Sequence, residues 1–118
     1  MNHDTIPLQE RKADFLATVT FLTIQQGGRS RPVYSGYRPL IKFRGKFELT
    51  SGQQVFIGAD HVNPGETAEA EITILWIEPF RNYLYPGLTF QFNEGSVLIG
   101  TGMIIKVFNK ELEREIPV

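Results

Sequence analysis

The residues of this chain that could bind an anion are gathered in one stretch of the sequence. Between Asp14 and Glu48 there is no acidic residue, whereas six basic residues occur there. They are Arg29, Arg31, Arg38, Lys42, Arg44 and Lys46. The planar guanidinium of arginine grips a phosphate or a carboxylate with two parallel donors. The four arginines are therefore candidate contacts to RNA or to another anion.

Two alternatives to anion binding stay open for these arginines. Charge clusters usually belong to a solvated face whose neutralising acids lie on other strands. Arg38 and Arg44 could equally hold loops, by pairing with acids or with carbonyl oxygens of the backbone. Arg29 is the strongest candidate for binding, because the backbone amides of the preceding Gly27-Gly28 could face the same anion.

A second candidate site is aromatic. Phe80, Tyr83 and Tyr85 lie close together in one segment between two predicted strands. Aromatic side chains at a loop tip favour contact with another protein, because they bury a large area at a small entropic cost. These three residues are therefore candidate protein contacts. The alternative is that they cover one end of the fold.

The sequence lacks the patterns that catalysis or cofactor binding would need. No Gly-x-x-x-x-Gly-Lys-[Ser/Thr] segment is present to cradle the phosphates of GTP, and no serine occupies a Gly-x-Ser-x-Gly elbow. There is no cysteine, and His3 and His61 have no further ligands spaced for zinc. Glu69 and Glu71 share a wet strand face, which is typical of solvated acids rather than of a catalytic pair. We therefore expect no enzymatic activity, no cofactor, no metal and no GTP binding.

The elements that must position these residues repeat with a period of two, the period of β-strands. Apolar and polar residues alternate in four runs, and turn segments such as Asn63-Pro64-Gly65 separate them. The predicted inward faces are Phe15, Ala17, Val19 and Phe21; Ala68, Ala70, Ile72, Ile74 and Trp76; Leu88, Phe90 and Phe92; and Val97, Ile99, Met103, Ile105 and Val107. Short strands at this spacing are typical of an all-β sandwich or barrel. We expect Trp76, Phe90 and Ile105 in its core.

Two features near the end of the chain refine this expectation. Asn93-Glu94-Gly95-Ser96 joins two alternating runs, which predicts a β-hairpin. Gly100 and Gly102 inside the last run indicate a bulge, or a corner where two parts of the backbone approach closely.

The length of 118 residues fits one domain. We divide the chain into a flexible N-terminal segment 1–13, a β-barrel domain 14–109 and a C-terminal tail 110–118. No apolar run approaches the ~18 residues that a membrane-spanning helix needs, and the polar start of the chain lacks the features of a signal peptide. Together with the lack of cysteine, these features predict a cytoplasmic protein without a membrane partner.

An ordered set of short motifs runs through most of the chain. The motifs are Gly27-Gly28-Arg29-Ser30-Arg31-Pro32, Gly36-Tyr37-Arg38-Pro39, Phe43-Arg44, Val62-Asn63-Pro64-Gly65, Gly87-Leu88-Thr89-Phe90, Glu94-Gly95 and Gly100-Thr101-Gly102. In order and spacing, the set resembles the C-terminal, third β-barrel domain of bacterial translation elongation factor Tu, and it extends from about Phe15 to Phe108. The resemblance implies a closed six-stranded antiparallel barrel that stands alone, without the GTPase domain of that family.

The resemblance also implies partners. In the family, this barrel contacts aminoacyl-tRNA, packs on the GTPase domain and meets the exchange factor. Arg29 and Gly95 match positions near the tRNA backbone, whereas Ser30 and Glu78 stand where the family often has a histidine or a basic residue. The arginines of the family's last hairpin are also absent.

These losses and the net charge of −1 favour a protein partner over a nucleic acid. We therefore expect a non-catalytic binding module that contacts protein partners of the translation machinery as a regulator or decoy. The alternative is binding of tRNA or ribosomal RNA through a basic rim, as in the family.

Overall fold

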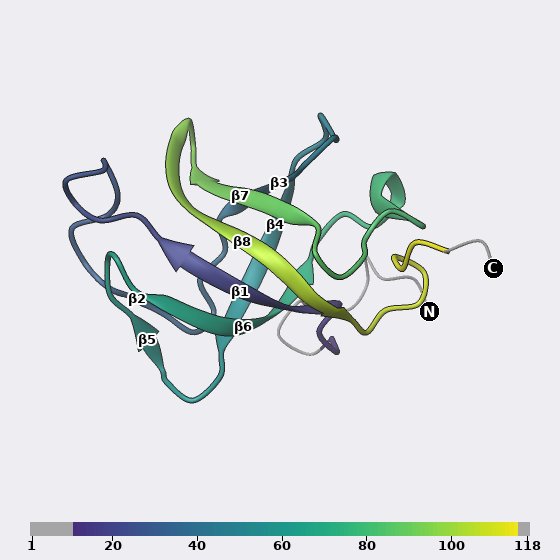
Figure 1. Cartoon of the computed structure of the whole chain (residues 1–118), viewed down its shortest axis with the longest axis horizontal. Coiled ribbons are helices and arrows are strands. Elements are labelled where there is room, and N and C mark those ends of the chain that lie inside the picture. Colours follow the sequence, from purple (N-terminus) through teal and green to yellow (C-terminus); the bar gives the residue numbers. More distant parts are fainter. Residues whose placement is uncertain (1–10, 116–118) are drawn as a thin grey trace.

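A computed structural model describes residues 11–115 of the chain, and its main element is a closed antiparallel β-barrel (Figure 1). The strands are β1 (Phe15–Phe21), β2 (Val33–Tyr34), β3 (Leu40–Phe43), β4 (Thr50–Phe56), β5 (His61–Val62), β6 (Thr67–Ile74), β7 (Thr89–Glu94) and β8 (Val97–Val107). The barrel has the strand order β1-β6-β4-β3-β7-β8 and closes between β8 and β1. The expected all-β, six-stranded antiparallel barrel is thus confirmed.

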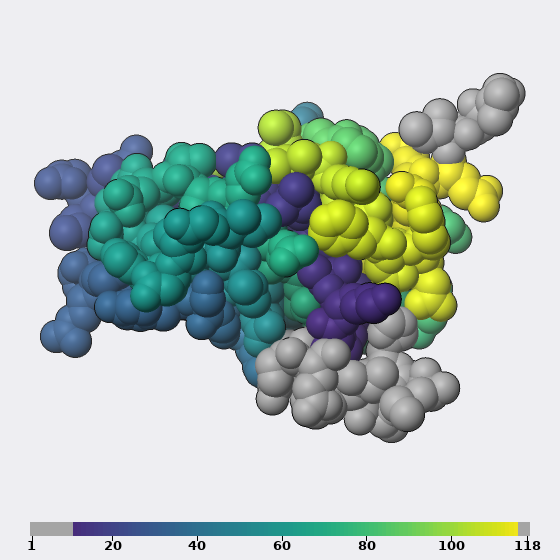
Figure 2. Space-filling model, turned by 90° about the horizontal axis from the view of Figure 1, so that it is seen from below, coloured from purple at the N-terminus to yellow at the C-terminus, as the bar shows by residue number. Residues whose placement is uncertain are grey.

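Two smaller elements lie at opposite ends of this barrel. The short strands β2 and β5 pair with each other as a separate arm, and the 3-10 turn η3 (Glu78–Phe80) belongs to the loop between β6 and β7. In Figure 1 the arm lies at the left end of the barrel and the loop that contains η3 at the right end. From the side, β1 lies between β6 and β8, as their pairing requires (Figure 2).

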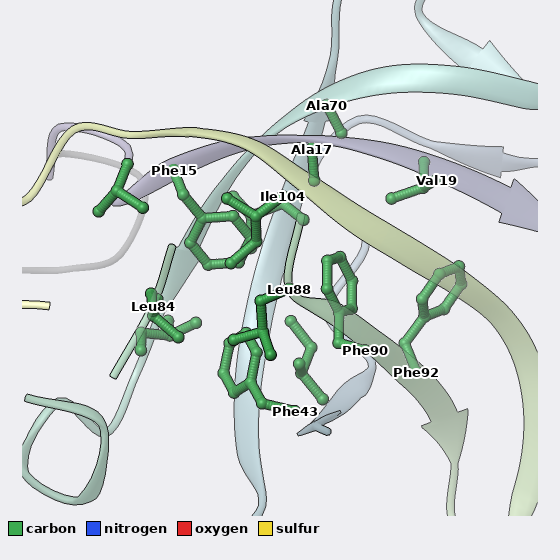
Figure 3. Close-up of a cluster of buried hydrophobic side chains, with 14 of the residues drawn as sticks. Phe15, Ala17, Val19, Phe43, Ala70, Leu84, Leu88, Phe90, Phe92 and Ile104 are labelled. Atoms are coloured by element: carbon green, nitrogen blue, oxygen red, sulfur yellow. The ribbon is translucent and has the colours of Figure 1, made fainter. Parts of the chain in front are cut away.

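The alternation in the sequence correctly places most of the core. The predicted inward residues of β1 and of the Leu88–Phe92 run are all buried, as are those of β6 from Ala70 to Ile74. Phe90 packs edge-to-face against Phe15 and Phe43, with ring centroids 5.9 and 5.8 Å apart. Figure 3 shows these rings filling the space inside the barrel. Aromatic pairs of this geometry stabilise a core beyond the area that they bury.

The predicted core positions of Trp76 and Ile105 are wrong. Trp76 follows the end of β6 and is 48% exposed, because the barrel wall ends before its side chain. Ile105 is 37% exposed because it is the extra residue of a β-bulge: Ala17 pairs with Ile104 and Leu16 with Lys106.

A second register shift lies at Ile99, between the Phe92–Gly100 and Asn93–Leu98 pairs. One extra residue moves the side chains of all following residues to the opposite face of the strand. The predicted inward face of β8 therefore holds for only part of its length. Ile99 and Val107 are buried, but Val97 and Met103 are exposed.

Gly100 and Gly102 face the barrel interior, where their missing side chains leave room for two rings. A Cβ on Gly102 would clash with the ring of Phe90, and one on Gly100 with the ring of Phe92. The close approach predicted for these glycines is confirmed, because each lies directly opposite its phenylalanine in the β7–β8 pair. The hairpin predicted at 93–96 joins the same two strands.

Asp14 links the start of the first barrel strand to residues at the ends of β6 and β8. Its carboxylate accepts hydrogen bonds from the Ile74 amide at 2.8 Å and from Asn109 Nδ2 at 2.9 Å, and it pairs with Arg11 at 3.3 Å. It therefore ties the start of β1 to the ends of β6 and β8. Of the expected flexible segment 1–13, residues 1–10 lie outside the described residues.

The described part of the expected C-terminal tail packs on the loop that follows η3. Leu112 is completely buried, and its carbonyl oxygen accepts hydrogen bonds from the Tyr83 and Leu84 amides at 3.1 and 2.8 Å. Over residues 11–115, the fold contains no helix with the length and apolar character of a membrane span.

Candidate functional site

Arg29, the leading anion-binding candidate, has a partner within the fold. Its Nη1 lies 2.6 Å from Glu94 Oε2, and the Tyr37 hydroxyl donates to the same oxygen at 2.5 Å. The guanidinium also lies over the Tyr37 ring, 5.8 Å from its centroid. The cluster links the segment before β2 with the β7–β8 hairpin, whose tip is the exposed Gly95. The structure thus brings Arg29 and Gly95 into one region.

The electrostatics of this cluster favour a structural role for Arg29. Burial opposes the ionisation of Glu94, but the hydrogen bonds from Tyr37 and Arg29 outweigh it and lower the pKa of this carboxyl. Burial and the neighbouring carboxylate raise the pKa of the Tyr37 hydroxyl, so that it stays a donor. A ligand phosphate at Arg29 would have to compete with a charge-assisted bond that is already formed.

Arg29 and Arg44 lie near opposite ends of one strand. Arg29 contacts Glu94 at the end of β7, whereas the backbone amide of Arg44 binds the carbonyl of Thr89 at its start. At ~3.3 Å per residue, these two positions on β7 are roughly 17 Å apart. Arg31 and Arg38 are exposed on the segment between β1 and β3.

Phe80 is not on the surface. Its side chain is completely buried and packs edge-to-face against Phe43, with the ring centroids 5.2 Å apart. The Trp76 ring stands almost perpendicular to it, at 89° and 6.5 Å. The expectation that Phe80 is an exposed protein contact is therefore wrong for the folded chain: it covers the barrel end and supports Trp76, which is half-exposed.

Tyr83 supports the connection between β3 and β4. Its hydroxyl donates to the Arg44 carbonyl oxygen at 2.6 Å, and the Lys46 ammonium lies 4.8 Å from the centre of its ring. A Cβ on Gly45, which has a φ of +84°, would clash with the same hydroxyl. Tyr85, the third predicted aromatic contact, is partly buried and carries Arg114 over its ring at 5.3 Å.

The largest exposed apolar side chains near this connection form a surface that the sequence did not reveal. Phe47 is 94% exposed, and Leu49 follows it on the same connection at 46%. Leu75 and Trp76, which are 51% and 48% exposed, lie on the segment that directly follows β6. Their amides donate to the Ser51 carbonyl oxygen and to Thr50 Oγ1, each at 2.9 Å. We call Phe47, Leu49, Leu75 and Trp76 the hairpin patch, after the β3–β4 hairpin whose connection bears Phe47 and Leu49. Its residues come from two segments far apart in sequence, so only the fold brings them together.

An open groove of about 630 Å³ runs beside the same connection. It is lined by Lys42, Arg44, Gly45, Thr89, Phe90, Gln91, Thr101, Gly102 and Met103. Most of these residues come from the outer faces of β3, β7 and β8 and from the start of the connection, whereas Phe90 and Gly102 are inward-facing residues at the floor of the groove. Its lining holds two cations and no acid.

The described residues contain no group of three or more potential metal-ligating side chains. His61 bonds its neighbour Asp60 at 2.7 Å and lies in the exposed β2–β5 arm. No protein-family model matches this chain.

Proposed function

We propose that this chain is a non-catalytic protein-binding module and that the hairpin patch is its contact surface. One observation carries the proposal: a phenylalanine that is 94% exposed stands on a connection that other residues hold in place. Isolated apolar residues on a surface need no explanation, but a contiguous group of large ones marks an interaction site.

The patch has the features of an interface that is ready to bind. Trp76 is half-exposed and rests on the buried ring of Phe80, so its indole is ordered before a partner arrives. The Tyr83 hydrogen bond to the Arg44 carbonyl oxygen fixes the start of the connection that bears Phe47. Preorganisation lowers the entropic cost of association, and tryptophan is prominent among the residues that dominate binding energy.

The aromatic loop that the sequence singled out keeps a role in this proposal. Phe80 and Tyr83 act through the residues that they support, and a partner touches Trp76 and Phe47 instead. The resemblance to the third domain of elongation factor Tu suggests the class of partner. We propose a protein of the translation machinery, for which this module acts as a regulator or decoy.

Binding of tRNA or ribosomal RNA has less support. Arg29 is engaged by Glu94, and the charges of Arg29 and Arg44 are separated along β7. Arg29 and Arg44 therefore do not belong to one run of adjacent phosphate contacts, the kind of contact that dominates affinity for nucleic acids.

The test uses the purified exchange factor of elongation factor Tu and its isolated GTPase domain. Binding of the wild-type chain to each is measured by calorimetry and compared with the Phe47→Ala variant. If Phe47 is an interface anchor, its truncation costs about 2 kcal/mol, or roughly a 30-fold loss of affinity.

The matched control is Val97→Ala, because Val97 is 51% exposed on the β7–β8 hairpin, away from the patch. It should bind like the wild type. Equal affinities of the Phe47→Ala variant and the wild type would exclude the hairpin patch as the contact surface. Binding of neither protein, combined with tight binding of tRNA, would favour the RNA alternative.

A further inference from the structure

The groove beside the hairpin patch presents two rows of polar side chains across three strands. In one row Lys42, Gln91 and Thr101 are paired neighbours on β3, β7 and β8. In the next row the Arg44 backbone bonds that of Thr89, which pairs with Met103. Since alternate residues of a strand share a face, all these side chains point outward, and each is exposed.

The polar groups of this groove are available to a ligand. Within residues 11–115, the side chains of Lys42, Arg44, Gln91, Thr89 and Thr101 make no hydrogen bond or ion pair. The acids of β6 lie on the far side of β1, two strand spacings from β8, or about 10 Å. The groove therefore presents two cations, two hydroxyls and an amide, and the described residues that line it include no acid.

The shape and lining of the groove favour a peptide over a nucleic acid. Proteins that bind single-stranded nucleic acid combine positive charge with aromatic rings on which the bases stack. Among residues 11–115, the only aromatic residue that lines this groove is Phe90, which is 2% exposed. Met103, at 47% exposure, instead offers an apolar contact that suits an aliphatic side chain.

We propose that this groove binds an extended, acidic segment of the protein partner. Lys42 lies in β3, and Arg44 directly follows this strand with its amide still bonded to the Thr89 carbonyl, so their Cα atoms are about 6.5 Å apart. Alternate carboxylates of an extended segment have the same spacing and can each meet one cation. Thr89, Thr101 and Gln91 then supply donors to the remaining carboxylate oxygens and to the peptide backbone.

The groove and the hairpin patch share the connection between β3 and β4, because Gly45 lines the groove and Phe47 follows two positions later. One partner can therefore place an apolar anchor on the patch and an acidic segment in the groove. In this respect the inference rests on the proposed function. The peptide-binding chemistry of the groove can nevertheless be tested without that partner.

The probe is a short synthetic peptide of alternating glutamate and threonine, with alternating glutamine and threonine as its neutral control. A short oligouridylate tests the nucleic-acid alternative. Titrations are followed by the backbone amide resonances of the protein, including those of Gln91 and Thr101. We expect the acidic peptide to shift the groove resonances, to bind more tightly than both other probes, and to weaken as salt is added.

The decisive variant is the double substitution Lys42→Gln and Arg44→Gln. It should weaken binding of the acidic peptide about tenfold, as expected for the loss of two exposed ion pairs. The control, Lys12→Gln with Lys106→Gln, removes the same charge elsewhere on the surface and should leave binding unchanged. Both pairs of side chains are exposed, so neither variant should unfold.

The outcomes separate this inference from the proposed function. Unchanged peptide binding by the Lys42 and Arg44 variant, or equal losses of affinity in both double variants, overturns the proposal that the groove binds an acidic segment. Tighter binding of oligouridylate than of the acidic peptide also overturns it, in favour of a nucleic-acid site. Phe47→Ala should not affect the peptide titration, so failure of the hairpin patch with the partner protein would leave this result standing.

Discussion

The replacement of Gly102 by alanine tests the packing between β7 and β8 inside the barrel. The new Cβ would overlap the Cζ atom of Phe90 and lie 2.6 and 2.8 Å from two further ring atoms. The ring cannot move aside, because Phe90 is 2% exposed and packs against Phe15 and Phe43. Gly102→Ala should therefore destabilise the fold although it adds only one methyl group.

The magnitude follows from two opposing terms. Overpacking of a well-filled core costs about 1–3 kcal/mol, and contact with three atoms of a confined ring places this case near the upper end. In the opposite direction, alanine stabilises the fold by about 0.5–1 kcal/mol, because glycine loses more backbone entropy on folding. The net loss in the free energy of unfolding should be about 2 kcal/mol, or roughly 8 °C in Tm for a domain of this size.

A double-mutant cycle with Phe90→Leu identifies the clash as the cause. The smaller side chain frees the space in front of Gly102, so alanine should then be nearly neutral. The coupling energy between the two sites should be roughly 1–2 kcal/mol. Urea unfolding can be followed by the fluorescence of Trp76, the only tryptophan. If Gly102→Ala costs the same in both backgrounds, or under about 0.5 kcal/mol in the wild type, the packing argument is refuted.

Three further outcomes can be checked by urea unfolding. Gln54→Leu should stabilise the fold by about 1–2 kcal/mol, because both polar atoms of this buried amide lack a hydrogen-bond partner among the described residues; a loss of stability would contradict it. Glu94→Gln should cost about 1 kcal/mol at neutral pH after allowance for solvent screening. The lowered pKa of Glu94 means that its contribution is present above its unfolded pKa and disappears as pH falls through the folded one, so wild type and variant should converge in acid; a constant gap between them would oppose this. Tyr83→Phe removes the hydrogen bond to the Arg44 carbonyl oxygen, so it should lower the free energy of unfolding by about 1 kcal/mol. The same variant should bind the partner protein more weakly although Phe47 itself is not substituted; full affinity would show that the connection needs no such support.

The sequence predicts this fold well wherever a strand is regular. Every second residue of β1 faces the core because no bulge interrupts the inward side from Ala17 to Phe21. In β8 the inward positions include Gly100 and Gly102, which carry no apolar side chain to mark them. The apolar residues of the opposite parity were therefore mistaken for the inner face. The bulge at Ile105 depends on the partner strand, and nothing local reveals it.

The candidate sites were harder to predict, because their partners are distant in sequence. Arg29 was recognised as a special residue, but its partner Glu94 lies 65 positions later and becomes visible only in the fold. Phe47 lies in an apolar-polar alternation that looks like the start of a strand, so nothing indicated its exposure. The signal that could have found it is the glycine at 45, since a turn there makes the following residues part of a projecting connection.

The loop after β6 and the connection between β3 and β4 work as one structural unit. Tyr83 contacts the connection at Arg44, Gly45 and Lys46, and the tail residue Leu112 holds Tyr83 in turn through its carbonyl oxygen. The connection is therefore supported at the residues that directly precede its exposed apolar side chains. A binding surface on such a support loses little conformational entropy when a partner arrives. This explains how a small barrel can present a bare phenyl ring in a defined position, with a strip of unpaired cations beside it.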